Sequence, residues 1–155
     1  MDTIDYTEIL KMISLVHRKT QIHLCQQTHL LELTQGQVPF IILTCQNGTM
    51  VQNRFCELLD ISKSTVAKTI AKLEEEGYVI RRENPQDGRS IDVYPTEKAK
   101  KIYPVLMQIG DDWVKQMLKG MTKLEQSIFF QMLSKISGNI SESFELAEHA
   151  MQTKE

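Results

Sequence analysis

The helix predicted over residues 63–76 constrains the fold more than any other segment, because both its ends and its two faces can be read from the sequence. Ser62 is a favourable N-cap residue, and Gly77 suits the left-handed position that follows the end of many helices. Apolar residues at helical spacing predict a buried face: Val66, Ile70 and Leu73. The opposite face combines small hydroxyl side chains with lysines: Ser64, Thr65, Lys68, Thr69 and Lys72. This helix therefore needs a core on one side and presents a polar, basic surface on the other.

Two short β-rich runs, residues 78–82 and 90–94, come directly after this helix and predict a hairpin. The segment between them contains an Asn-Pro and an Asp-Gly pair, which are strong turn signals. The first run carries Arg81 and Arg82, and the turn carries Arg89. The hairpin is therefore expected to present a basic tip next to the helix.

Further helices are predicted on both sides of this unit. Apolar periodicity places them at about residues 5–31, 38–46, 51–59, 97–119 and 122–150. Thr34 and Gln37 predict a capping box with Thr34 as N-cap of the second helix, and Thr122 and Glu125 predict one for the last helix. The expected fold class is mainly α with a small β-hairpin wing (α+β).

The order of these elements predicts a winged helix-turn-helix at about residues 34–95, within a single domain that spans residues 1–155. The flanking helices, at about residues 5–31 and 97–150, carry more apolar surface than the smaller middle region can cover. We therefore expect them to be dimerisation helices. A homodimer would also bring two recognition helices to half-sites about one turn of DNA apart.

The composition is that of a globular protein, with 41% hydrophobic and 25% charged residues. No apolar run approaches the length of a membrane span, and the acidic start lacks the features of a signal peptide, so we expect a cytoplasmic protein without a membrane partner. The formal net charge is −2, so binding of nucleic acid has to depend on where the cations lie rather than on their sum.

The polar face of the predicted helix has the chemistry of a DNA reader. Hydroxyl groups can exchange hydrogen bonds with base edges, lysines neutralise phosphates, and an arginine on a thin hairpin can enter the narrow minor groove. The residues predicted to contact double-stranded DNA are Lys63, Ser64, Thr65, Lys68, Thr69, Lys72, Arg81, Arg82 and Arg89. The helix alone is equally compatible with an ordinary surface helix with solvated lysines, but the hairpin directly after it favours DNA binding.

Four segments carry a resemblance to a known family: Ile61–Val66, Leu73–Val79, Asp87–Ser90 and Tyr94–Ala99. In order and spacing they resemble the MarR family of winged-helix transcriptional regulators, and the resemblance covers most of the chain. It implies a homodimer whose first and last helices intertwine, with the recognition helix in the major groove and Arg89 in the minor groove. It also implies that Asp87 orients the wing through an ion pair.

The expected function is therefore that of a sequence-specific transcriptional regulator, a repressor that binds a pseudo-palindromic operator. The resemblance further implies release by a small aromatic or lipophilic effector, held between the dimer region and the DNA-binding part. Its walls would come from the first helix, residues 40–45 and the stretch at 103–107, although no charge cluster identifies the ligand.

Two alternatives keep the same fold. The first is a redox-sensing regulator that uses Cys25, Cys45 or Cys56, and the second is a winged-helix protein-interaction module without DNA binding. An odd number of cysteines without a CxxC pair argues against a disulfide framework and a zinc site. The sequence offers no nucleophile–base pair and no Gly-rich phosphate loop, and Glu74-Glu75-Glu76 is interpreted as a solvated helix end. We expect no enzyme, no cofactor and no metal site.

Overall fold

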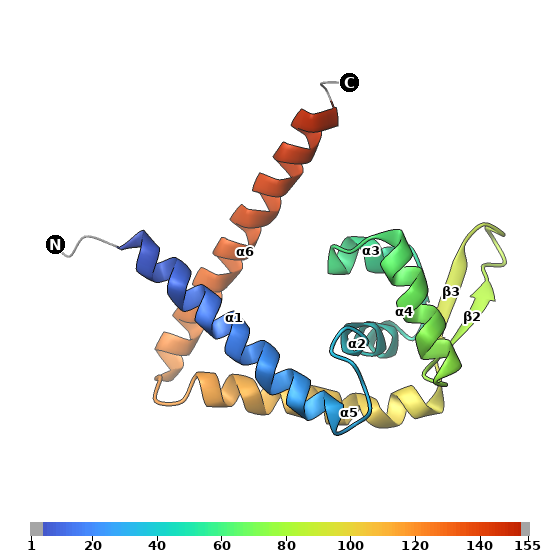
Figure 1. Cartoon of the computed structure of the whole chain (residues 1–155), viewed down its shortest axis with the longest axis horizontal. Helices are drawn as coiled ribbons and strands as arrows, with labels where there is room; N and C mark the ends of the chain where they lie inside the picture. Colours follow the sequence, from blue (N-terminus) through green and yellow to red (C-terminus); the bar gives the residue numbers. More distant parts are fainter. Residues whose placement is uncertain (1–4, 153–155) are drawn as a thin grey trace. The chain divides into compact units, whose positions relative to one another are not determined.

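The computed structural model describes residues 5–152, and their side chains as far as residue 145. Figure 1 shows its helices and strands, which are α1 (Tyr6–His29), α2 (Val38–Asn47), β1 (Met50–Val51), α3 (Arg54–Leu59), α4 (Lys63–Glu75), β2 (Val79–Glu83), β3 (Ile91–Pro95), α5 (Glu97–Met117) and α6 (Lys123–Gln152). The predicted class, mainly α with a small β-hairpin, is confirmed. The described chain forms two compact units, one that extends to Trp113 and one that begins at Val114.

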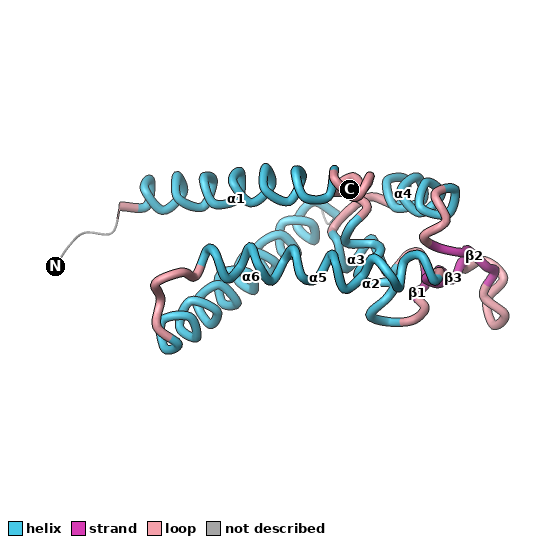
Figure 2. Tube along the Cα trace, turned by 90° about the horizontal axis from the view of Figure 1, so that it is seen from below, coloured by secondary structure: helices cyan, strands magenta, loops and turns pink. Residues whose placement is uncertain are grey.

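The sheet of the first unit is antiparallel and has the order β1-β3-β2. β2 and β3 form the predicted hairpin, with Arg82 opposite Asp92, and Figure 2 shows the loop that joins them projecting away from the helices. The prediction of a helix from residue 51 is wrong, because Met50 and Val51 form the edge strand β1. Met50 lies opposite Val93, and a two-residue strand that depends on such a distant partner leaves no local periodicity to detect.

The core of this unit fixes which face of α4 is buried. The rings of Phe40 on α2 and Phe55 on α3 stack with their centroids 4.9 Å apart. Val66, Ile70 and Leu73 on α4 are at most 1% exposed, as predicted. Burial of each such side chain stabilises the fold by about 1.5–3 kcal/mol. The polar face of α4 is consequently turned to the outside.

Both predicted ends of α4 are confirmed to within one residue. The side-chain oxygen of Ser62 accepts a hydrogen bond from the backbone N–H of Thr65, so Ser62 is the N-cap. Gly77 has a φ of 79°, and the N–H groups of Gly77 and Tyr78 donate to carbonyls of the last turn. This is the glycine-based termination that the sequence predicts, and it directs the chain straight into β2.

The capping box predicted before α2 is partly wrong. Gln37 is the N-cap residue, and Pro39 lies in the first turn, where its fixed φ favours a helix start. The Gln37 side chain does reach back to accept from the backbone N–H of Thr34, at 2.8 Å. The Thr34 hydroxyl donates to the same Gln37 oxygen at 3.1 Å, and Thr34 lies three residues before the N-cap position.

In the second unit, the other predicted capping box is confirmed at the start of α6. The N–H of Thr122 donates to the Glu125 carboxylate at 2.7 Å, and the N–H of Glu125 donates to the Thr122 hydroxyl at 3.3 Å. These hydrogen bonds hold the pKa of Glu125 below its usual value. Among the residues that the structure describes, no helix is long and apolar enough to cross a membrane.

Candidate nucleic-acid interface

The polar face of α4 carries most of the predicted DNA contacts and is exposed. Exposed side chains are Lys63, Ser64, Thr65, Lys68 and Lys72, and Thr69 is half-buried. Within residues 5–152, Lys63 and Lys68 make no ion pair or side-chain hydrogen bond. Their charges are therefore available to a polyanion.

The hydroxyl groups of α4 gather at its N-terminus. The Ser62 oxygen lies 3.1 Å from that of Ser64 and 2.9 Å from that of Thr65. The Thr69 hydroxyl donates to the backbone carbonyl of Thr65 at 2.9 Å. A hydroxyl has one proton and two lone pairs. Ser62 uses all three, because its oxygen also accepts from the backbone N–H of Thr65. The hydroxyls of Ser64, Thr65 and Thr69 retain acceptor capacity for an outside donor such as a base amine.

Lys72 is the one predicted contact on α4 whose charge is shared with acidic neighbours. Its Nζ lies 3.4 Å from a Glu75 carboxylate oxygen and 3.5 Å from one of Glu76. The hydrogen bond to Glu75 is the main reason why the pKa of Lys72 is raised. Exposed pairs of this kind are weak and screened by salt, so a phosphate can compete for the ammonium.

Arg81 on β2 binds the last turn of α4 through both its backbone and its side chain. Its backbone N–H donates to Glu74 Oε1 at 2.8 Å, and its Nε and Nη2 both lie 2.8 Å from Glu74 Oε2. The backbone hydrogen bond is the largest cause of the lowered pKa of Glu74. The interpretation of Glu74 as a solvated helix end is therefore wrong. This pair, the Glu74–Arg81 clamp, ties the wing to the recognition helix.

The turn of the wing is held by side chains that accept backbone hydrogen bonds. The Asn84 carbonyl oxygen accepts from the N–H groups of Gln86 and Asp87 at 2.9 and 3.1 Å. Asp87 accepts from the Ser90 hydroxyl at 2.7 Å and from the Arg89 N–H at 3.1 Å, which lowers the pKa of Asp87. The predicted ion pair of Asp87 is not among the ion pairs of the described residues, because the short turn satisfies the carboxylate locally.

The two remaining wing arginines differ in their surroundings. Arg89 is exposed, and its guanidinium makes no hydrogen bond or ion pair with any described residue. The guanidinium of Arg82 lies over the ring of Tyr94, 5.5 Å from its centroid. A cation–π contact at an exposed site leaves the charge of Arg82 in place while restricting its direction.

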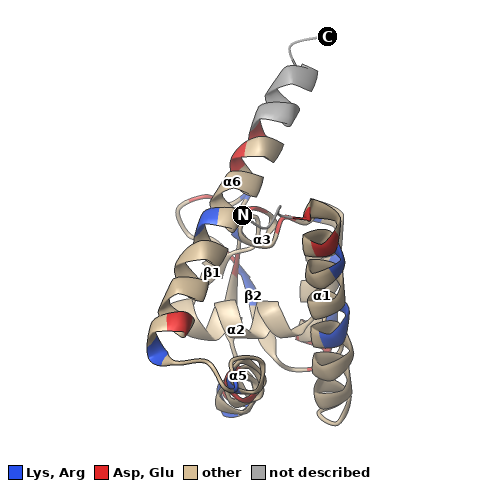
Figure 3. Ribbon diagram, turned by 90° about the vertical axis from the view of Figure 1, so that its left-hand side faces the viewer, with Lys and Arg blue, Asp and Glu red and all other residues tan. Residues whose placement is uncertain are grey.

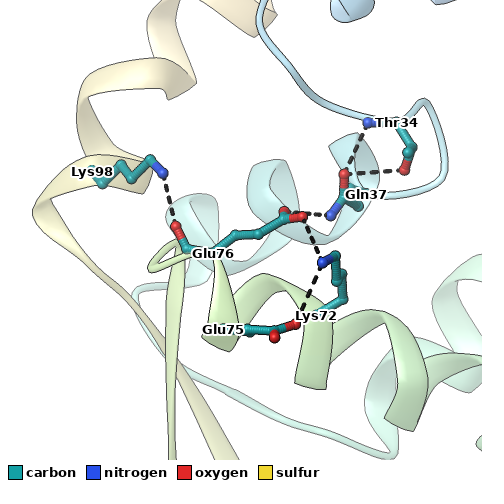
Figure 4. Close-up of polar contacts among 6 residues, drawn as sticks. All are labelled: Thr34, Gln37, Lys72, Glu75, Glu76 and Lys98. Atoms are coloured by element: carbon teal, nitrogen blue, oxygen red, sulfur yellow. Dashed lines mark hydrogen bonds and ion pairs between the residues drawn. The ribbon is translucent and has the colours of Figure 1, made fainter.

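A polar network, shown in Figure 4, connects the end of α4 to two other segments. The buried Gln37 donates to Glu76 Oε2 at 2.7 Å, across 39 positions of sequence. Lys98 on α5 donates to the backbone carbonyl of Glu76 at 2.7 Å and lies over the Tyr78 ring, 4.2 Å from its centroid. Neither Gln37 nor Lys98 is marked in the sequence as a positioning residue, because they reach Glu76 across 39 and 22 positions of chain.

A cavity of about 470 Å³ lies within the first unit, between α1, the loop before α2, α2 and α5. Its walls are mostly apolar and include Leu24, Ile42 and Leu106. Each of the three segments predicted to enclose an effector contributes to this lining, through Leu24, Ile42 and Leu106, and the α5 contribution continues to Gly110.

The cysteines and histidines of the described chain form no group that could hold a metal ion. All three cysteines are free thiols, with Cys25 exposed and the other two half-buried. Burial raises the pKa of Cys45, which disfavours the reactive thiolate. On α1, His23 stacks on Trp113 of α5 with the centroids 4.2 Å apart, and the Trp113 indole donates to the Thr20 hydroxyl at 3.0 Å.

Known proteins similar to this chain are transcriptional regulators. The MarR family model matches residues 31–90. The HTH-type transcriptional regulator YybA of Bacillus subtilis is 30% identical over 115 residues, which are 74% of this chain and 77% of that protein. The crystal structure of the transcriptional regulator SlyA is 28% identical, with a TM-score of 0.82 over 90% of this chain and 98% of that one.

A further similar structure is that of a MarR family transcriptional regulator from Listeria monocytogenes, crystallised in complex with a 26mer DNA. It is 25% identical, with a TM-score of 0.80, and the match covers 92% of both chains. The proteins of this group are regulators of transcription and not enzymes. The capped α4, the hairpin after it and these likenesses agree: the chain belongs to the MarR family of DNA-binding winged-helix transcriptional regulators.

Proposed function

We propose that the protein is a homodimeric repressor that binds a pseudo-palindromic operator in the cytoplasm. The observation that carries this proposal is that three of the cations predicted to contact DNA form no ion pair with a described residue. The charged groups of Lys63 and Lys68 on α4 and of Arg89 at the wing tip have no partner among the described residues, and these side chains are exposed. Charges left unpaired on two neighbouring projections suit two neighbouring grooves of DNA. The relative from Listeria was crystallised with a 26mer DNA, which supports DNA as the partner.

In this proposal α4 lies in the major groove and the loop between β2 and β3 reaches the minor groove. The contacts are made by Lys63, Ser64, Thr65, Lys68, Thr69, Lys72, Arg82 and Arg89. For Arg81 we propose a role other than the predicted DNA contact, because its guanidinium is paired with Glu74. We assign to Arg81 the task of fixing the wing against α4, and to Asp87 the task of shaping the turn beneath Arg89.

A homodimer is supported by the apolar surface of both long helices. On α1 the exposed apolar side chains are Ile9, Leu10, Met12, Ile13, Leu15, Val16 and Ile22. On α6 they are Leu124, Ile128, Phe129, Phe130, Met132, Leu133, Ile136, Ile140 and Phe144, and Figure 3 colours most of the described part of this helix as uncharged. Apolar surface of this extent on a globular protein marks an interaction site.

Release by a small-molecule effector is the regulatory part of the proposal, and it is supported by the cavity beside the loop before α2. Gly36 and Val38 line that cavity, and Gln37 between them donates to Glu76 at the end of the recognition helix. A ligand that displaces this loop would therefore shift α4, because Gln37 connects the loop to the end of that helix.

The experiment that tests the proposal is selection of bound sequences from random duplex DNA, followed by titration of the selected site at several salt concentrations. A dimeric reader should select two inverted half-sites whose centres are about 10 bp apart, and log affinity should fall steeply with log salt. Selection of a single, unpaired half-site would contradict the dimer. Absence of any binding at low salt would contradict DNA binding and favour a protein-interaction module.

A further inference from the structure

The residues that line the cavity between α1, α2 and α5 determine which ligand charge the cavity can hold. Among the described residues that line it, none is charged. Leu24, Ile42 and Leu106 supply apolar surface from three different helices. A volume of about 470 Å³ is in the range of small-molecule sites.

The polar groups of the walls are few, and one of them is already used. The Thr28 hydroxyl donates to the carbonyl of Cys25 at 3.3 Å. Gln21 on α1 and Gln35 in the loop before α2 also line the cavity, and their amide groups make no hydrogen bond with a described residue. An amide both donates and accepts, so these two side chains match a hydroxyl, carbonyl or amide group on a ligand.

A carboxylate would meet no cation in this cavity. An ionised group loses its hydration on entering an apolar site, and this cost is recovered only where a cation or several donors replace the water. Two neutral amides replace only part of the hydration that a carboxylate loses. They supply both a donor and an acceptor, which is what an uncharged polar group needs. The walls therefore favour the neutral member of any pair of ligands with equal shape.

We propose that this cavity binds an uncharged, mainly apolar small molecule with one hydrogen-bonding group, and that it discriminates against carboxylates. The inference rests on the proposed effector site for its location. It adds that Gln21 and Gln35 are the residues that set the ligand class.

The test compares 2-naphthamide with 2-naphthoate, which have the same ring system and differ in charge at neutral pH. Isothermal titration calorimetry on the full chain should show the amide binding at least ten-fold more tightly. Gln35→Lys should shift this preference toward the carboxylate by at least ten-fold, because it brings a cation to the wall. Gln46→Lys is the matched control, since Gln46 is an exposed glutamine of α2 outside the cavity walls, and it should change neither affinity.

Gly110 provides the location control. A Cβ added at this wall residue of α5 would meet no atom within 4 Å, so a larger side chain can start in open space. Gly110→Phe should abolish amide binding, and a thermal melt checks that this variant folds. If it does not fold, Gly110→Leu takes its place and should weaken amide binding.

Three results would overturn the inference: tighter or equal binding of the carboxylate, no amide binding at millimolar concentration, or amide binding that the Gly110 variants do not change. Titration of DNA with the same samples separates this failure from that of the proposed function. Retained salt-dependent DNA binding with any of these three results refutes this inference and leaves the proposed DNA-binding function standing.

Discussion

The Glu74–Arg81 clamp allows a prediction that separates a structural arginine from a DNA-contacting one. Arg81→Ala removes two contacts of 2.8 Å to Glu74, and Glu74→Ala removes these and the hydrogen bond from the Arg81 backbone. Hydrogen bonds to charged groups contribute about 1.5–3 kcal/mol when buried, and exposed ion pairs about 0–1 kcal/mol. The two side chains are 35% and 37% exposed, so we expect a coupling free energy of about 1 kcal/mol.

The assay is urea unfolding of both single variants and the double variant at one protein concentration, because the stability of a dimer depends on concentration. Glu74→Ala should cost more than Arg81→Ala, since it also leaves the Arg81 backbone N–H without its partner. DNA titrations at several salt concentrations complete the test. Arg81→Ala should leave the slope of log affinity against log salt unchanged.

Two results would refute this reasoning. Additive effects of the single substitutions would mean that the two side chains of the clamp contribute no coupling free energy. A slope that becomes less steep by about 0.9 in Arg81→Ala would mean that Arg81 neutralises a phosphate itself.

The same pair predicts a dependence of stability on pH. The pKa of Glu74 in the folded protein is below its ordinary value of 4.5, mainly because the Arg81 backbone N–H donates to the carboxylate. Its stabilising contribution is therefore fully present above about pH 4.5 and is lost as the pH falls through the folded value. Unfolding of the Glu74→Ala variant should depend less on pH in this acidic range than unfolding of the unaltered protein, and equal dependence would contradict the assignment.

Three further substitutions test the interface and its support. Arg89→Ala should weaken operator binding about ten-fold and make the salt slope less steep, while thermal stability stays unchanged; normal operator binding would exclude Arg89 from the interface. Asp87→Ala should also weaken operator binding, by loosening the turn, but with the salt slope unchanged in the same titrations. Val66→Asp should cost more than about 3 kcal/mol in urea unfolding, because it buries an unpaired charge at a position that is 1% exposed; a folded, stable variant would mean that α4 packs differently.

Features that depend on neighbouring residues could be predicted from the sequence. Ser62 and Gly77 act within one turn of the helix that they bound, so both ends of α4 follow from residue type. The capping box at Thr122 and the turn before Arg89 are local in the same sense. The polar face of α4 follows from helical spacing once its ends are known.

Features that depend on distant partners could not be predicted. β1 exists because Met50 and Val51 pair with a strand some forty positions away in the chain, which no local pattern records. In the sequence Glu74 is one of three consecutive glutamates, and only the folded hairpin brings Arg81 next to it. Gln37 resembles an ordinary helix-start residue, yet it is 5% exposed and bound to Glu76. Chain topology, rather than residue type, selects these contacts.

The stacking of His23 on Trp113 gives the chain an optical property. Trp113 is the single tryptophan of the sequence, and its ring lies against α1 while its own backbone belongs to α5. The emission of an indole depends on the groups in contact with its ring, so separation of these two helices would change the intrinsic fluorescence of the whole protein. Movement of α1 against α5 can therefore be followed in solution, in real time and without a label.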